Sequence, residues 1–212
     1  MGRLADLDAV TLDVNGTLIG LADPVPKLER ILRGLGVERS AAEIRRAFEA
    51  EGRVYAGRAA AAHEPAAFAA IQRECTGVFL QELRAGLDPA DFTDSYVGVM
   101  TFEVLPGVVD SLRLLRERGL DLAVVANFDL TLGQRLDELG LRCWFSTVVT
   151  PADAGAAKPD PAIFELALAR LGVSADRALH IGDGESDAQG ARAAGMHFAP
   201  APVADALRSW NE

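Results

Sequence analysis

Four short polar segments of the sequence carry side chains that could together perform phosphoryl transfer. A carboxylate such as Asp13 can attack phosphorus and form an acyl phosphate, which divides one difficult hydrolysis into two steps. The attack brings two anions together, so a cation must offset their charge. Lys158 is one such cation, and a magnesium ion held by Asp13, Asp183 and Asp187 would be a second, since Mg²⁺ prefers carboxylate, water and phosphate oxygens. The four segments contain, in chain order, Asp13, Asn127, Lys158, and Asp183 with Asp187.

The residues after Asp13 form a candidate phosphate cradle. Gly16 allows a tight turn, and the backbone amides of such a turn make a concavity that binds anions. The hydroxyl of Thr17 follows directly and is a further candidate contact for a phosphate. Each segment taken alone is weak evidence, and the prediction depends on the order and placement of all four.

The chain from about residue 20 to residue 100 is predicted to be helical. Ser40 and Glu43 have the spacing of a capping box, and Asp88 precedes a proline at a first helical position. Pro65 interrupts the alanine-rich stretch 59–70 or begins a new helix there.

From about residue 101 the pattern changes to alternating strands and helices. The apolar, β-branched run 120–126 is typical of a buried strand. Ser186 and Gln189 have the spacing of a capping box for the helix that ends before Gly195. The other predicted strands are 10–12, 147–149, 178–181 and 196–199. Three further helices are predicted: one from about 108 to 119, one that follows the strand 120–126 and ends at 140, and one from 161 to 171.

This alternation predicts an α/β fold, with a Rossmann-like parallel sheet core flanked by helices. Consecutive βαβ units build a parallel sheet and place a binding site at the carboxyl ends of its strands. Residues 1–19 and 101–212 are expected to form this core, and residues 20–100 an inserted α-helical cap subdomain.

Net charge and the distribution of apolar residues restrict the kinds of partner and the cellular compartment that we expect for this protein. The 212 residues carry a net charge of −10, which argues against a nucleic-acid surface because such surfaces need clustered Lys and Arg. The first ten residues include Arg3, Asp6 and Asp8 without an apolar run, and no segment has the length of a membrane span, so we expect a cytoplasmic protein. His63, His180 and His197 lack metal-ligand spacing and are expected to be structural or exposed.

The motifs resemble those of the haloacid dehalogenase-like (HAD) hydrolases, and within that superfamily the cytoplasmic phosphatases with a helical cap. The resemblance implies that Asp13 is the nucleophile and that Lys158 stabilises it. It also implies a Mg²⁺ site made by Asp13, Asp183, Asp187 and the backbone carbonyl of Asn15. The segments that carry it are Asp13-Val14-Asn15-Gly16-Thr17-Leu18, Asn127-Phe128-Asp129, 158–164 and 182–191.

Two residues depart from the pattern of these phosphatases. Asn15 replaces the aspartate that acts as general acid and base, and a carboxamide cannot exchange a proton at neutral pH. Ala126 replaces a serine or threonine that donates to the phosphate, although Asn127 beside it is a candidate replacement. Together the departures predict weak or specialised phosphatase activity.

Three functions remain open from the sequence. The first is a Mg²⁺-dependent phosphatase acting on a small phosphorylated or anionic metabolite through an aspartyl phosphate. The second is a 2-haloacid dehalogenase, a branch that also lacks the second aspartate but generally replaces the residue at Asp183. The third is a phospho-ligand-binding protein without turnover. In the cap, Arg45, Arg46, Arg53, Tyr55 and Arg58 are candidate substrate contacts, and either a monomer or a homodimer is compatible with the sequence.

Overall fold

The structure is a computed structural model that describes residues 3–62 and 64–210, so that His63 lies outside the described residues. The chain divides into two compact units. One, here called the core unit, comprises Met1–Gly20 and Glu103–Glu212, and the other, here called the helical unit, comprises Leu21–Phe102. Two short strands that the sequence analysis did not predict, β2 (Ile19–Leu21) and β3 (Phe102–Val104), pair with each other where the chain passes between the units.

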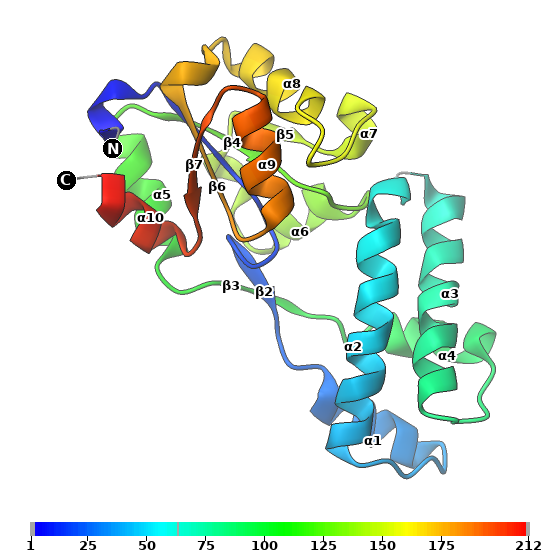
Figure 1. The fold of residues 1–212 in the computed structure, drawn as a ribbon. Helices are drawn as coiled ribbons and strands as arrows, with labels where there is room; N and C mark the ends of the chain where they lie inside the picture. The colour runs from blue at the N-terminus through cyan, green and yellow to red at the C-terminus, as the bar shows by residue number, and fades with distance from the viewer. Residues whose placement is uncertain (1–2, 63, 211–212) are drawn as a thin grey trace. The chain divides into compact units, whose positions relative to one another are not determined.

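The core unit is built on a five-stranded sheet whose neighbouring strands all run parallel, which confirms the predicted α/β class (Figure 1). Its central strand is buried along its whole length, as expected for an apolar run covered on both faces. In spatial order the strands are β5 (Thr147–Val149), β4 (Asp121–Val125), β1 (Ala9–Leu12), β6 (Ala178–Gly182) and β7 (His197–Pro200).

The strand order fixes where a site can form. From β1 the chain continues outwards to β4 and β5, and it then returns to the other side of β1 for β6 and β7. The carboxyl ends of β1 and β6 therefore flank the point where the order reverses, which is the usual place of a ligand crevice in open α/β sheets. Leu12 pairs with Ile181 in this register, so the loops after the two strands begin side by side.

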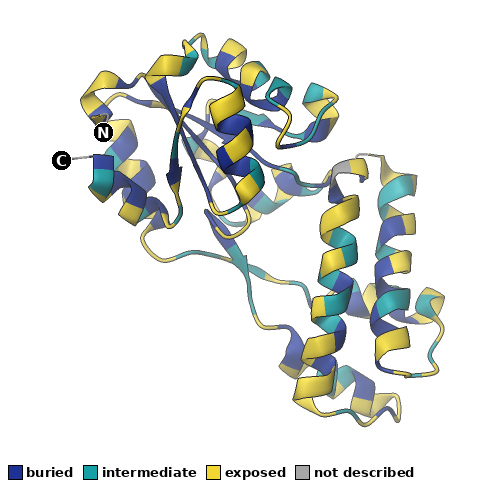
Figure 2. Ribbon diagram, in the orientation of Figure 1, coloured by how far each residue is buried: buried dark blue, intermediate teal, exposed yellow. Residues whose placement is uncertain are grey.

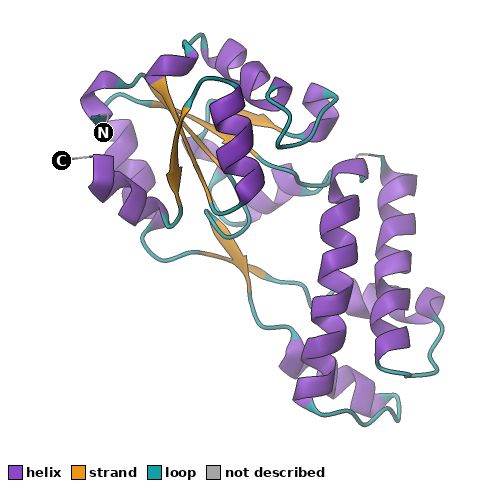
Figure 3. Ribbon diagram, viewed as in Figure 1, coloured by secondary structure: helices purple, strands orange, loops and turns teal. Residues whose placement is uncertain are grey.

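Helices cover both faces of the sheet (Figure 3). In Figure 1, α5 and α10 lie together on one side and α8 and α9 on the other. Phe164 of α8 packs with Val125 and Val149 of the strands in one apolar cluster. The helices are α5 (Val108–Glu117), α6 (Leu132–Glu138), α7 (Pro151–Ala154), α8 (Ala162–Leu171), α9 (Glu185–Ala193) and α10 (Val203–Trp210).

The described residues of the helical unit form four α-helices around an apolar cluster of their own. Phe79 and Tyr96 lie at its centre with ring centroids 4.7 Å apart. Buried and exposed residues alternate along each helix, as Figure 2 shows. The helices are α1 (Val25–Gly34), α2 (Ala41–Arg58), α3 (Pro65–Glu82) and α4 (Pro89–Val97).

Several predicted helix boundaries are confirmed, and one is wrong. The capping box of Ser40 is present, Pro65 begins α3, and the side chain of Asp88 caps α4. The predicted cap at Ser186 is wrong, because α9 already begins at Glu185 with Gly184 as its N-cap residue. No helix among the described residues is long and apolar enough to cross a membrane.

Candidate active site

Asp13 is the first residue after β1 and lies where the strand order predicts a site. Its backbone N–H donates to the carbonyl of Ile181 at 2.9 Å, which continues the pairing of β1 with β6 by one residue. Its side chain is almost fully buried. The fold thus places a buried carboxylate at the carboxyl edge of the sheet, next to the loop that follows β6.

Lys158 lies between α7 and α8 and directs its ammonium group at this carboxylate. Its Nζ donates to Oδ1 of Asp13 at 2.5 Å, to Oδ1 of Asp187 at 2.6 Å and to the carbonyl of Val125 at 3.1 Å. Only 3% of the lysine side chain is exposed. All three donor positions of the ammonium are therefore used, and the group is fixed between the two aspartates.

The backbone of Lys158 is held by Asn127. The Nδ2 group of Asn127 donates to the lysine carbonyl at 2.9 Å, and its Oδ1 accepts from the lysine N–H at 2.8 Å. Both ends of the carboxamide are therefore engaged. The side chain of Asn127 therefore contacts the backbone of Lys158, and the phosphate contact expected from the sequence stays a prediction.

Asp187 is the third residue of α9 and joins the helix to the buried ion pair. Its Oδ2 accepts from the N–H of Gly184 at 3.0 Å, which caps the helix, and its Oδ1 accepts from Nε2 of His180 at 2.9 Å as well as from Lys158. Burial raises the pKa of Asp187, but the hydrogen bond from His180 and the charge of Lys158 outweigh burial and lower the pKa to about 2. Asp187 is thus held as a carboxylate.

Asp183 lies directly against the loop that follows Asp13. A Cβ atom added to Gly16 would lie 2.0 Å from Oδ2 of Asp183, and the φ of Gly16 is +73°. Glycine is required here for both reasons, since only glycine adopts this φ readily and leaves room for the carboxyl. The turn predicted at Gly16 therefore serves to bring Asp183 close to the loop.

Asp13, Asp183 and Asp187 form a group of carboxylates in which one oxygen from each residue lies within 4.8 Å of the other two. Burial raises the pKa of Asp13 despite the charge of Lys158, and burial together with the charge of Asp187 raises the pKa of Asp183. Three carboxylates around one ammonium leave the group short of positive charge. An all-oxygen donor set with an excess of negative charge fits a hard divalent cation such as Mg²⁺.

The family can now be assigned. A family model described as haloacid dehalogenase-like hydrolase matches residues 7–195. The chain belongs to the haloacid dehalogenase-like hydrolases. The resemblance to this superfamily inferred from the motifs is therefore confirmed.

This HAD-like chain is similar in sequence or structure to several known proteins. It is 49% identical over 98 residues to the human haloacid dehalogenase-like hydrolase domain-containing protein 3, an alignment that spans 46% of this chain but only 39% of the human protein. It is 30% identical over 201 residues to a phosphoglycolate phosphatase of Pseudomonas putida, covering 88% of this chain and 66% of that protein. The solved structure of a HAD phosphatase from Thermococcus onnurineus superimposes with a TM-score of 0.56 at 26% identity, over 91% of this chain and 85% of that one.

The two departures from the phosphatase pattern occupy different surroundings in this HAD-like chain. Asn15 is exposed, in the loop two residues after Asp13, whereas Ala126 is buried directly after β4. Thr17 is also buried, and its hydroxyl has no hydrogen-bond partner among the described residues. The roles assigned to these residues from the sequence stay predictions.

The sequence analysis did not connect His180 with this site. It expected a structural or exposed histidine, and in the structure the ring is completely buried, with Nε2 2.9 Å from Oδ1 of Asp187. Burial lowers the pKa of His180, which favours the neutral ring. A polar residue within the otherwise apolar run 178–181, three positions before Asp183, was the available signal.

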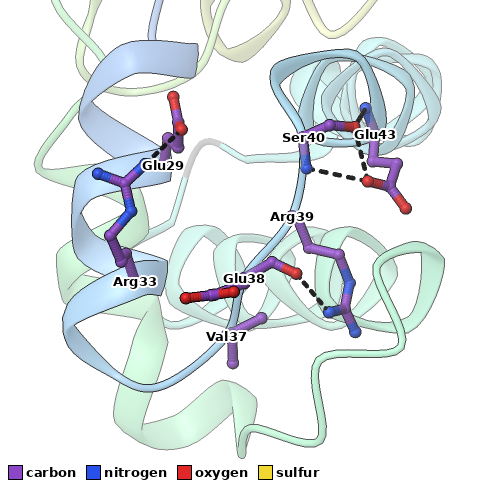
Figure 4. Close-up of a pocket in the computed structure, with 7 residues that line it drawn as sticks. All are labelled: Glu29, Arg33, Val37, Glu38, Arg39, Ser40 and Glu43. Carbon is purple, nitrogen blue, oxygen red and sulfur yellow. Dashed lines mark hydrogen bonds and ion pairs between the residues drawn. The ribbon is translucent and has the colours of Figure 1, made fainter.

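The predicted cap contacts belong to the helical unit and are partly paired there. Arg45 donates to Asp23 at 2.9 Å and Arg58 donates to Glu74 at 3.0 Å. A pocket of about 380 Å³ in this unit contains further paired charges (Figure 4). It is lined by Glu29, Arg33, Val37, Glu38, Arg39, Ser40 and Glu43.

Proposed function

We propose that this chain is a Mg²⁺-dependent phosphatase that transfers a phosphoryl group from a small phosphorylated metabolite to Asp13 and then to water. The observation that carries the proposal is the buried Lys158, whose ammonium lies 2.5 Å from Asp13 and 2.6 Å from Asp187. A lysine held in this way offsets charge at the carboxylate that attacks.

The chemistry divides into two balanced steps. In the first, an oxygen of Asp13 forms a bond to phosphorus while the bond from phosphorus to the leaving oxygen breaks. In the second, water attacks the aspartyl phosphate, inorganic phosphate leaves, and the carboxylate of Asp13 is restored. Lys158 remains hydrogen-bonded beside the reacting oxygen in both steps.

The residues that would hold the magnesium ion are Asp13, Asp183, Asp187 and the backbone carbonyl of Asn15. Their support is the group of three carboxylates, together with the turn at Gly16 that a side chain would fill. The ion would supply positive charge to the transferring phosphoryl oxygens.

Asn15 and Ala126 set the expected level of activity. General acid and base catalysis contributes about 10²–10⁴-fold, and Asn15 cannot supply it. A hydrogen bond to a charged group contributes about 1.5–3 kcal/mol, and the side chain of Ala126 cannot donate one. A substrate whose leaving group needs no protonation, such as an acyl phosphate, is therefore favoured for the first step.

The similar proteins support the substrate class and not a particular substrate. The Pseudomonas putida relative is a phosphoglycolate phosphatase, so a small phosphorylated acid is a reasonable first compound to test. The helical unit is proposed to act as the cap that selects the substrate.

The deciding experiment is Mg²⁺-dependent phosphate release from p-nitrophenyl phosphate and acetyl phosphate. We expect slow release that favours acetyl phosphate, disappears in Asp13→Ala and increases strongly in Asn15→Asp. Asn15→Ala is the matched control, because it removes the carboxamide without adding an acid. Release that persists in Asp13→Ala would refute the proposal.

The other two functions are outcomes of the same series. Halide release from 2-chloropropionate that is insensitive to EDTA would identify a dehalogenase. Binding of inorganic phosphate in calorimetry, with no turnover in the wild type or in Asn15→Asp, would identify a binding protein. The observation that favours this function is that Asn15 and Ala126 lack the functional groups usual at these positions in the phosphatases.

A further inference from the structure

His180 belongs to a chain of hydrogen bonds that begins at Thr11 on β1 and ends at Asp13, directly after β1. The hydroxyl Oγ1 of Thr11 lies 2.8 Å from Nδ1 of His180, and Nε2 of His180 lies 2.9 Å from Oδ1 of Asp187. The same oxygen accepts from Lys158 at 2.6 Å, and Lys158 donates to Asp13 at 2.5 Å. Thr11 and Asp13 are two residues apart on an extended segment and so project to the same face. The five side chains therefore form a hydrogen-bonded chain whose two ends are joined by the backbone of residues 11–13, an arrangement here called the ring.

The partners determine where the hydrogens of this ring lie. Oδ1 of Asp187 is a carboxylate oxygen, so Nε2 of His180 must carry the hydrogen of their bond. In the neutral ring, Nδ1 is then an acceptor, and the hydroxyl of Thr11 donates to it. Every polar atom of the imidazole is thus engaged, and each bond specifies the next.

Packing holds the imidazole in this orientation. Its side chain is fully buried, and the ring of Phe164 contacts it edge-on with centroids 4.9 Å apart and planes at 88°. Phe198 lies on another side, with a centroid distance of 6.4 Å. Rotating the histidine would break two buried hydrogen bonds, so the ring presents Nε2 to Asp187 in one orientation only.

We propose that His180 is a positioning residue, which fixes Asp187 so that the ammonium of Lys158 is held against Asp13. Without the donor on His180, Oδ1 of Asp187 keeps Lys158 as its one remaining side-chain donor in the ring, and the carboxylate can turn about its Oδ2 contact with Gly184. The ammonium would then follow the carboxylate away from Asp13. The kinetic consequence rests on the proposed function, whereas the structural consequence does not.

The sequence offers a direct reporter for this proposal. Lys27 and Lys158 are the only lysines in the chain, so a Lys27→Arg background leaves one lysine. Lys27 is exposed in the helical unit, and its replacement leaves the ring untouched. In protein labelled with ¹³C and ¹⁵N in lysine, the side-chain signals of Lys158 report its environment by NMR without any turnover.

Three variants in this background separate donation from packing. His180→Leu keeps an apolar side chain of similar size but removes the donor, and His180→Gln retains an N–H at a similar reach. Leu179→Ala is the matched control, since Leu179 is an equally buried neighbour on the opposite face of β6. We expect the Lys158 signals to shift in His180→Leu, to return toward the parent position in His180→Gln and to stay unchanged in Leu179→Ala.

A milder variant covers the case in which His180→Leu does not fold. Thr11→Val removes only the hydroxyl that donates to Nδ1 of His180. In ¹⁵N spectra of histidine-labelled protein we expect the Nδ1 signal to shift, while the Nε2–H that Asp187 accepts is retained as in the parent. An Nδ1–H tautomer in the parent would overturn the proposal. Unmoved Lys158 signals in His180→Leu would do the same.

Kinetics separate this proposal from the proposed function. Removing a residue that orients a site ligand typically reduces activity or metal affinity about 10–100-fold. We expect His180→Leu to lower kcat for acetyl phosphate by this factor with a smaller change in KM, and His180→Gln to recover most of it. If the parent has no turnover, the proposed function fails, but the NMR signals still decide the role of His180.

Discussion

Replacing Gly16 with alanine should weaken Mg²⁺ binding strongly while destabilising the fold only modestly. The added Cβ would lie 2.0 Å from Oδ2 of Asp183 and 2.7 Å from its Cγ. Cβ contacts below 3.0 Å essentially never occur, so the carboxyl of Asp183 must move by at least 1.0 Å. Ligand distances in a well-formed metal site stay within about 0.2 Å of their usual values, so a displaced Asp183 carboxylate is a poorer ligand.

The cost in stability can be separated from the cost in binding with a second glycine. Gly172 has a φ of +70°, close to the +73° of Gly16, but a Cβ there meets nothing within 4 Å. Both alanine variants carry the same left-handed backbone penalty of about 1–2 kcal/mol. For a chain of this size that penalty lowers Tm by about 2–8 °C. Because Asp183 is exposed and can rotate, Gly16→Ala should unfold within the same range as Gly172→Ala.

The assay is calorimetric titration with Mg²⁺, alongside thermal unfolding of the wild type and both variants. Gly172→Ala should bind Mg²⁺ like the wild type, and Gly16→Ala should bind it at least about 10–100-fold more weakly, the loss typical of disturbing a metal site's outer partners. Equal Mg²⁺ affinity in the two variants would refute the assignment of Asp183 as a ligand that the Gly16 turn accommodates.

Three further substitutions test other parts of the structure. Lys158→Met should destabilise the core unit by about 3–5 kcal/mol in urea unfolding, because it leaves Asp13 and Asp187 as buried charges without their cation; unchanged stability would contradict the buried ion pairs. Burial raises the pKa of Glu51 above its ordinary value of 4.5, although the hydroxyl of Tyr96 donates to it. Protonated Glu51 therefore stabilises the folded state below about pH 4.5, and this stabilisation is lost as the pH rises. Glu51→Gln should accordingly raise Tm at pH 8, and the gain should vanish toward pH 4; a lower Tm at pH 8 would contradict this. Asn15→Asp should weaken the binding of inorganic phosphate by a few-fold, since two charges about 4 Å apart in water interact by about 1 kcal/mol; tighter binding in calorimetry would contradict it.

The parts of the fold that follow from local pattern could be predicted from the sequence. Strand β4 contains an apolar, β-branched run and β6 is mostly apolar, and a parallel sheet gathers the residues after such strands at one edge. Asp13 and Asp183 were placed together by this rule, and the structure brings them together. The position of Lys158 was harder to predict, because its backbone is held by a hydrogen bond from Asn127, which is 31 residues away in the sequence.

The parts that depend on distant partners could not be predicted. His180 and Thr11 are 169 residues apart, and nothing local in either segment indicates their hydrogen bond. The start of α9 was misplaced at Ser186 because Asp187 performs two roles, capping the N–H of Gly184 with one oxygen and binding Lys158 with the other. The pattern of a capping box does not show that a carboxylate is shared in this way.

The ring of buried groups and Asp183 support the proposed function to different degrees. Stability alone could account for the ring, because Asp13, Lys158 and Asp187 are buried and paired, and removing one partner is strongly destabilising. Asp183 is different, since it is exposed and lies outside the two ion pairs of Lys158. Partial desolvation and the charge of Asp187 oppose its ionisation and raise its pKa. The chain nevertheless places this carboxyl against a glycine with a left-handed φ that a side chain would obstruct. A bound divalent cation would reverse the sign of that electrostatic contribution. Asp183, and not the more conspicuous ion pair, is therefore the residue whose position argues most directly for a metal-dependent site.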